Sequence, residues 1–124
     1  MTPFTLVLMD CTRKEQIDGA HSFVATDRSG RFGLQAGHET FVTCLQPGLA
    51  RYKTDDSHWH YIAQPGATLW FHNNRLQLMT TQFVLSDSRQ QLLHLLLIYR
   101  QVQLRQLHRQ SLDFSNRIGL LRLE

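Results

Sequence analysis

The feature that most constrains the fold of this chain is a change of hydrophobic period near residue 85. Before that point, apolar residues come in short runs that alternate with polar ones, and turn-forming residues separate the runs. This pattern is typical of a small antiparallel β domain that closes as a sandwich or a flattened barrel. The candidate strands are residues 4–9, 22–26, 31–35, 40–46, 49–53, 58–63, 67–72, 75–80 and 82–85.

The clearest hairpin is the segment ATLWFHNNRLQLMT, residues 67–80. Asn73 and Asn74 lie at its centre, and asparagine tolerates the positive φ angles that a two-residue turn requires. Because side chains alternate along a strand, each strand of the hairpin has one apolar face. These faces consist of Ala67, Leu69 and Phe71 on the first strand and of Leu76 and Leu78 on the second.

After residue 85 the pattern becomes helical. Ser86 is a suitable N-cap, and neither Gly nor Pro occurs from 87 to 110, so we predict one helix over 87–110. Leucines form a stripe along one side of this helix, and they must dock on an apolar surface. Ser111 and Asp113 are suited to cap a second, shorter helix. The chain is therefore predicted to divide into a β domain, 1–85, and a helical domain, 86–124.

The excess positive charge lies in the predicted helical domain. Of the 124 residues, positions 1–85 carry seven basic and seven acidic side chains, whereas positions 86–124 carry six arginines and three acids. Arginine pairs with carboxylates or phosphates through two parallel hydrogen bonds, which favours a binding role over a merely solvated face. Acidic loops of a protein partner and nucleic acid are both compatible with this charge, but no recognised nucleic-acid-binding motif accompanies the arginines.

The sequence also bears on the location of the protein. Cys11 and Cys44 are too few for a disulfide framework, which indicates free thiols in a reducing compartment. The N-terminus lacks the features of a signal peptide, and the apolar run at 92–99 is too short to span a membrane. We therefore expect a soluble cytoplasmic protein that meets a membrane only through a partner.

A glycine-rich stretch, GRFGLQAGHETFVTCLQPG at 30–48, has a local explanation. Gly30 and Gly33 are expected to serve a hairpin and a bulge, and Gly37 a tight reversal. Pro47-Gly48 is expected to form another turn. Local geometry accounts for each turn but not for the order of the whole stretch.

That order resembles the N-terminal domain of the ε subunit of rotary F-type ATP synthases, where the loop reads approximately G-x-x-G-x-x-P-G-H-A-P-x-x-T-x-L-x-P-G. Thr43 and Leu45 also fall on family positions, and YIAQPGATLWFHNNRLQLMTT at 61–81 resembles the strand, turn and strand that follow in the family. The resemblance covers roughly residues 4–85. Ala36 stands where proline is usual, and Glu39-Thr40 replaces Ala-Pro.

The resemblance implies a flattened antiparallel β-sandwich of about ten strands, followed by a C-terminal helical hairpin. It also implies a non-catalytic central-stalk subunit, wedged between the γ shaft and the ring of c subunits, of an F-type or a divergent N-type enzyme. In that family the C-terminal helices can inhibit ATP hydrolysis by meeting acidic loops of the catalytic hexamer.

Two sets of candidate site residues follow from the resemblance. The expected interface with the c ring and γ comprises Arg28, Gly30, Arg31, Gly33, Gly37 and His38. Family members often carry an acidic residue at the position of Arg31. For His38 an alternative interpretation is a surface-loop histidine whose ring packs on neighbouring backbone. The expected regulatory contacts are Arg89, Arg100, Arg105, Arg109, Arg117 and Arg122.

Two further motifs are incomplete. His58 and His60 point the same way on a predicted strand, as in a metal-binding H-x-H pair of a cupin-like enzyme, but no third ligand is evident. The stretch LSDSRQ matches only half of the nucleotide-sensing pattern (I/L)-D-x-x-R-A, with Leu85 and Arg89 kept and Ser86 and Gln90 departing. We therefore expect no metal, no bound nucleotide and no cofactor.

Overall fold

The computed structural model describes residues 3–98, 100–101 and 105. In this part of the chain the polypeptide forms ten strands, which pair in a single sheet. Their bounds are β1 Phe4–Met9, β2 Lys14–Ala20, β3 Ser22–Asp27, β4 Gly30–Leu34, β5 Phe41–Leu45, β6 Gly48–Lys53, β7 Trp59–Gln64, β8 Ala67–His72, β9 Arg75–Thr80 and β10 Val84–Ser86.

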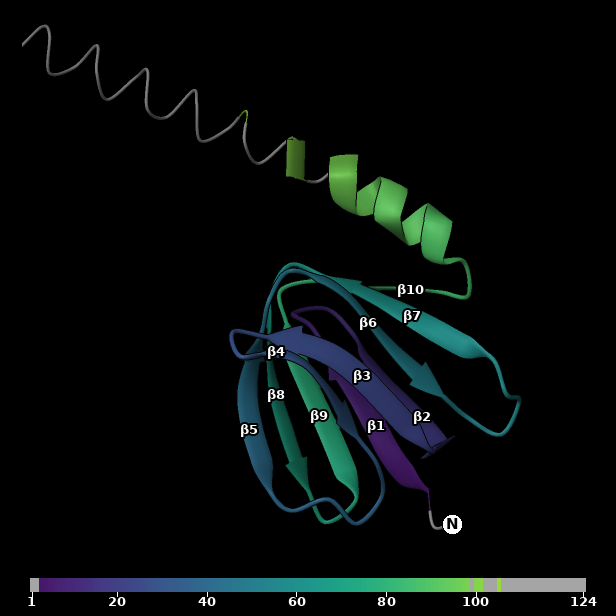
Figure 1. The fold of residues 1–124 in the computed structure, drawn as a ribbon. Helices are drawn as coiled ribbons and strands as arrows, with labels where there is room; N and C mark the ends of the chain where they lie inside the picture. Colours follow the sequence, from purple (N-terminus) through teal and green to yellow (C-terminus); the bar gives the residue numbers. More distant parts are fainter. Residues whose placement is uncertain (1–2, 99, 102–104, 106–124) are drawn as a thin grey trace, which may run out of the picture. The chain divides into compact units, whose positions relative to one another are not determined.

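The sheet runs in the order β10-β7-β6-β3-β5-β8-β9-β1-β2, and β4 pairs with β3 beside this path. Figure 1 shows that the sheet curls over and forms two layers. One layer contains β5, β8, β9, β1 and β2, and the other contains β3, β6, β7 and β10. The two layers face a common hydrophobic core. The predicted flattened sandwich of about ten strands is therefore confirmed.

The two layers join at a narrow corner between β3 and β5. One residue pair, Asp27 with Leu45, connects these strands in the sheet. A backbone hydrogen bond of 2.9 Å from the nitrogen of Gln46 to the oxygen of Thr26 adds to it. Side-chain bonds must therefore supply much of what holds this corner.

One parallel pairing places the first strand of the chain inside its layer, next to the edge strand β2. Strand β1 lies parallel to β9, and the register places Leu6 opposite Leu76 and Leu8 opposite Leu78. All four leucines are fully buried. Leucine side chains buried to this extent stabilise a fold by about 1.5–3 kcal/mol each, so the parallel pairing is anchored mainly by apolar contact.

The hairpin of β8 and β9 has the predicted form. Asn73 and Asn74 adopt φ angles of 50° and 55°, as the two-residue turn requires. The predicted apolar faces on both strands are buried. The Phe71 ring also meets the Phe4 ring edge to face at 5.7 Å, which ties the hairpin to β1.

Two strand features were not predicted. Strand β2, with the sequence KEQIDGA, has mostly exposed side chains because it lies at the edge of the sheet, and it therefore lacks the apolar alternation of the other strands.

The bulge predicted at Gly33 is absent, since Gly33 pairs in regular register with Val24. The register instead shifts between Phe4 and Leu6, in the pairing of β1 with β2.

The helix begins later than predicted. Ser86 pairs with Tyr61 as the last residue of β10, because strand pairing continues past Leu85, and it does not cap the helix. The helix is continuous over 89–98, and the hydroxyl of Ser88 accepts a hydrogen bond from the nitrogen of Gln91 at 3.3 Å, as an N-cap does. Residues 100, 101 and 105 are also helical, whereas the predicted second helix lies outside the described residues. In the part of the chain that the structure describes, no helix has the length and apolar character of a membrane span.

Two compact units divide the chain, Met1–Leu93 and His94–Glu124. The first unit includes the start of the helix, where Leu92 is fully buried. The strands end at Ser86, so the residues from 87 to 93 are helical in large part and yet belong to the β unit. The predicted division at residue 85 remains a prediction about which part folds alone.

This arrangement predicts the shortest stable form of the β unit. A chain that ends at Leu93 should unfold cooperatively, and a chain that ends at Leu85 should be less stable, because it lacks Leu92. In the longer chain, Leu92→Ala should cost about 2–5 kcal/mol, the usual range for a buried leucine, whereas Leu93→Ala should change little because Leu93 is 37% exposed. Urea unfolding of the four chains measures this, and equal stability of the two lengths would contradict it.

Candidate functional site

The turn between β3 and β4 is held by a buried carboxylate. Asp27 accepts hydrogen bonds from the nitrogen and the hydroxyl of Ser29 at 2.8 and 2.5 Å, and from the hydroxyl of Thr43 at 2.8 Å. The bonds from Ser29 and then from Thr43 lower the pKa of Asp27, because they favour its ionised form. Asp27 therefore fixes the turn that carries Arg28 and Gly30, and it ties that turn to β5 across the corner of the sandwich.

A second loop, residues 35–40, is held against the turn between β8 and β9. Gly37 adopts a φ of 82°, as predicted for a tight reversal, and its nitrogen donates a hydrogen bond to Oδ1 of Asn74 at 2.6 Å. The His38 ring lies edge-on to Phe41 at 5.8 Å and to Phe71 at 6.0 Å. His38 remains an exposed residue, so this loop could present it to a partner.

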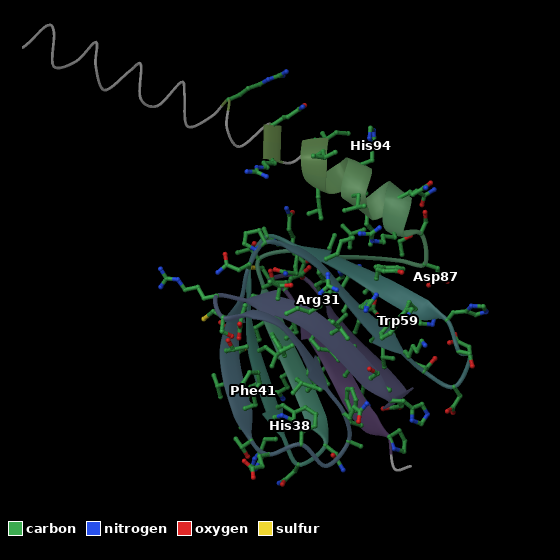
Figure 2. All side chains as sticks on the ribbon, viewed as in Figure 1. Arg31, His38, Phe41, Trp59, Asp87 and His94 are labelled. Atoms are coloured by element: carbon green, nitrogen blue, oxygen red, sulfur yellow. The ribbon has the colours of Figure 1, made fainter. Side chains whose placement is uncertain are left out.

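The structure separates the predicted interface residues into two groups. The first group lies on the hairpin of β3 and β4 and consists of Arg28, Gly30, Arg31 and Gly33. The turn of this hairpin lies near the start of β8, because Leu45 of β5 pairs with Asp27 on one side and with Ala67 on the other. Gly37 and His38 lie near the other end of β8, beside Phe71. Figure 2 shows Arg31 and His38 well apart, with His38 next to Phe41.

Arg31 faces a pocket that contains two other arginines. The pocket measures about 410 Å³ and is lined by Arg31, Arg51 and Arg89, with Tyr61 and small or aliphatic residues of β3 and β6. The guanidinium of Arg51 also lies 4.3 Å from the centre of the Trp59 ring. The ion pairs found in the described residues involve none of these three arginines. The pocket is therefore suited to an anionic group, and it brings Arg31 and Arg89 together although the sequence assigned them to different sites.

An apolar strip runs over the outer face of β5, β8 and β9. We define it as Val42, Trp70 and Met79, whose exposed fractions are 63%, 41% and 46%. Val42 pairs directly with Trp70, and Met79 pairs with the neighbouring Thr68. The Trp70 ring stacks on His72 at 5.7 Å, which holds it in place. Exposed aromatic and Met side chains on a rigid sheet are typical of a protein interface.

The predicted regulatory arginines lie only partly within the described residues. Arg89 lies at the start of the helix, and Arg100 and Arg105 are exposed helical residues. Arg109, Arg117 and Arg122 lie outside the described residues.

The predicted histidine pair separates into two environments. Both ring nitrogens of His60 are bonded to carboxylates, those of Asp87 and Asp56 at 2.5 and 2.7 Å, whereas His58 is exposed. Within residues 3–98, 100–101 and 105, no group of three His, Cys, Asp or Glu side chains is arranged to hold a metal ion.

Sequence reasoning missed the apolar strip and Arg51. The strip could have been found from the same alternation that identified the strands, because Trp70 lies between Leu69 and Phe71 and must point away from the core. Arg51 alternates in the same way with the buried Ala50 and Tyr52, but its meeting with Arg31 and Arg89 depends on strand order, which a single sequence does not reveal.

A family model described as the ATP synthase delta/epsilon chain β-sandwich domain matches residues 5–86, which include all of the strands except the first residue of β1. The chain belongs to the ATP synthase delta/epsilon family. The curated epsilon chain 2 of the ATP synthase of Cereibacter sphaeroides is 33% identical over 75 residues, which are 60% of this chain and 47% of that relative. This delta/epsilon chain thus spans about half the length of the curated relative it matches.

Solved structures share the fold of this delta/epsilon chain. A chain of the Euglena gracilis mitochondrial ATP synthase OSCP/F1/c-ring structure matches with a TM-score of 0.61 and 19% identity, over 68% of this chain and 56% of that one. A chain of the Tetrahymena thermophila mitochondrial ATP synthase central stalk/c-ring structure matches with a TM-score of 0.57 and 12% identity, over 68% and 69%. At these identities the likeness establishes the fold alone.

The corner of the sandwich gives a pH-dependent prediction for this delta/epsilon chain. Because the pKa of Asp27 is lowered by folding, its ionised form contributes stability above its unfolded pKa of about 3.9, and this contribution is lost as the pH falls through the folded pKa. Asp27→Asn should therefore be destabilised at pH 7 and should approach the wild type as the pH falls to about 3. Urea unfolding at both pH values, with Glu39→Gln as an exposed control, measures the difference. A deficit of equal size at both pH values would contradict the role of the carboxylate.

Proposed function

We propose that this chain is a central-stalk rotor subunit of a rotary ATP synthase or ion-translocating ATPase, where it links the γ shaft to the c ring. It has no catalytic role of its own in this proposal. Membership of the delta/epsilon family supports it, and so does the likeness of the fold to chains of ATP synthase structures that contain the c ring and, in one of them, the central stalk. The chain would lie in the cytoplasm, at the inner face of the membrane that holds the complex.

The observation that carries the proposal is the apolar strip of Val42, Trp70 and Met79. The same three strands place alternate residues in the core, so the strip is a second apolar surface on an already stable layer. A rotor subunit needs such a surface, because torque passes only between parts that stay firmly attached. We assign the strip to the γ shaft.

The two groups of predicted interface residues supply the remaining contacts. In this proposal the hairpin with Arg28, Gly30, Arg31 and Gly33 meets acidic or polar loops of the c ring, and the loop with Gly37 and His38 extends the contact with γ. Both loops are held by hydrogen bonds to side chains, which supports a binding role. Asp27 accepts hydrogen bonds from Ser29 and Thr43, and Asn74 accepts one from the nitrogen of Gly37. The arginine pocket would take a carboxylate of a partner between its three guanidinium groups.

The helical part is proposed to regulate the complex. Leu95, Leu97 and Ile98 are exposed by 48%, 59% and 45%, so the helix carries apolar surface that a partner can cover. Arg100 and Arg105 are exposed on the same segment, and they can select acidic loops of the catalytic hexamer. The combination suits a helix that exchanges between docking surfaces.

The assignment of the strip to γ predicts the effect of a single charge. Trp70→Asp should weaken binding to the γ-containing complex by about 2 kcal/mol or more, roughly 30-fold in Kd, as expected at the centre of an interface. Val84→Asp is the matched control, because Val84 is 44% exposed on β10, which lies far from β8 in the strand order. Titration of the complex with each variant measures this, after thermal melting has established that each is folded. Equal affinities of the two variants would contradict the assignment.

The regulatory role predicts a gain of ATP hydrolysis. A complex assembled with the chain ending at Leu93 should hydrolyse ATP faster than one with the full chain. Replacing Arg105, Arg109 and Arg122 with Ala should give part of this gain, and replacing them with Lys a smaller part, because Lys keeps the charge but not the paired hydrogen bonds. If hydrolysis by the truncated complex equals that of the intact one over a range of salt, the helix does not regulate.

A further inference from the structure

His60 joins the sandwich to the segment that leads into the helix. It lies on β7, and its two ring nitrogens contact two carboxylates: Nδ1 is 2.5 Å from Oδ1 of Asp87, and Nε2 is 2.7 Å from Oδ2 of Asp56. Asp56 belongs to the turn between β6 and β7, and Asp87 follows β10, two residues before the helix begins. One imidazole ring therefore bridges a hairpin of the sandwich and the entrance to the helix.

This bridge requires a protonated ring. A neutral imidazole has one N–H donor, whereas both partners of His60 are carboxylates, which only accept hydrogen bonds when ionised. If the ring lost its proton, one of its nitrogens would present a lone pair to a carboxylate at hydrogen-bond distance. The observed geometry therefore fits the imidazolium, and deprotonation breaks one of the two contacts.

The two carboxylates beside the ring favour this charge state. Burial of the ring opposes the charge, but the hydrogen bonds and charges of Asp87 and Asp56 outweigh it and raise the pKa of His60. The Tyr52 ring of β6 stacks on the His60 ring at 5.1 Å. The pKa of Tyr52 is raised mainly by its burial and further by the charges of Asp87, Asp56 and Glu15, so Tyr52 stays neutral. The side chain of His60 is 19% exposed and that of Asp87 is 79% exposed, so a proton can leave and solvent screens the bridge in part.

A neighbouring histidine–aspartate pair lies outside the segment that leads into the helix. His21, between β2 and β3, contacts Asp55, which adjoins Asp56 in the same turn. That pair joins two parts of the sandwich and does not include the residues before the helix. It therefore provides a matched control for the His60 bridge.

We propose that His60 is a pH-dependent latch, which when protonated holds residues 87–93 against the sandwich and which releases the entrance to the helix when it loses its proton. The full strength of the latch is present below the ordinary histidine pKa of about 6.5, and it is lost as the pH rises through the higher value of the folded state. Leu92 stays buried by apolar contact, so the proton modulates the docking of the first turn without abolishing the fold. The latch involves this chain alone, so it is independent of the proposed rotor function.

The amide of Leu92 reports directly on the latch. It donates a hydrogen bond to the oxygen of Ser88 at 3.3 Å, and this bond exists only while the first turn of the helix is formed. In the full chain, NMR hydrogen exchange, corrected for the intrinsic effect of pH, should show protection of Leu92 that falls several-fold between pH 5.5 and 9. The midpoint should coincide with the titration of His60 followed by its ring resonances, and the amide of Leu78 in the core should show no such change.

Variants separate the latch from a general effect of pH. In Asp87→Asn and in His60→Gln, the protection of Leu92 should be lower at pH 5.5 and should no longer depend on pH. In Asp55→Asn, the pH dependence should persist as in the wild type. The proposal is overturned if Leu92 protection in the wild type does not change with pH, or if either of the first two variants keeps the wild-type dependence.

Discussion

The structure depends on the corner where its two layers meet at a single residue pair, Asp27 with Leu45. A carboxylate in a buried position is costly unless its oxygens are satisfied, and here Ser29 and Thr43 satisfy them from both sides of the corner. The same side chain therefore shapes the β3–β4 turn and fixes β3 to β5. Because β5 pairs along its length with β8, the position of the turn relative to the outer face of that layer is also fixed.

In the proposed rotor role, the corner keeps two contact surfaces in a constant relation. A subunit that joined a shaft to a ring would need this, because torque would otherwise bend it. Here the β3–β4 hairpin and the apolar strip lie on the two sides of the corner, and the core between the layers is closely filled by Phe4, Phe23 and Phe71. The alternation of β8 serves both purposes, since Leu69 and Phe71 fill the core while Trp70 faces outward. The first unit, Met1–Leu93, includes the first turn of the helix, whereas the later helical residues belong to the second unit.

The sequence predicted those parts of the fold that local rules determine. The β8–β9 hairpin was predicted to the residue, because asparagines at its turn and strict alternation on its strands agree. Strand β2 was missed because an edge strand of polar residues has no apolar pattern, and Ser86 was misread as a cap because strand pairing outweighed its preference for a helix start. The spatial grouping of the candidate site residues does not follow from such local rules. Arg31 and His38 are seven residues apart in the sequence, yet they lie toward opposite ends of β8. Conversely, Arg31 lines the same pocket as Arg89, and His60 contacts Asp87. These two proximities arise from strand order, which the sequence alone does not reveal.

In the proposed assembly, the outer face of β5, β8 and β9 seats this chain on the γ shaft. The most direct measurement replaces Trp70 with a photo-crosslinking amino acid in the assembled complex and identifies the cross-linked chain by mass spectrometry, with the same replacement at Val84 for comparison. We expect a cross-link from position 70 to γ in high yield and none to γ from position 84. A cross-link from position 70 to another subunit, or none at all while position 84 reaches γ, would contradict it.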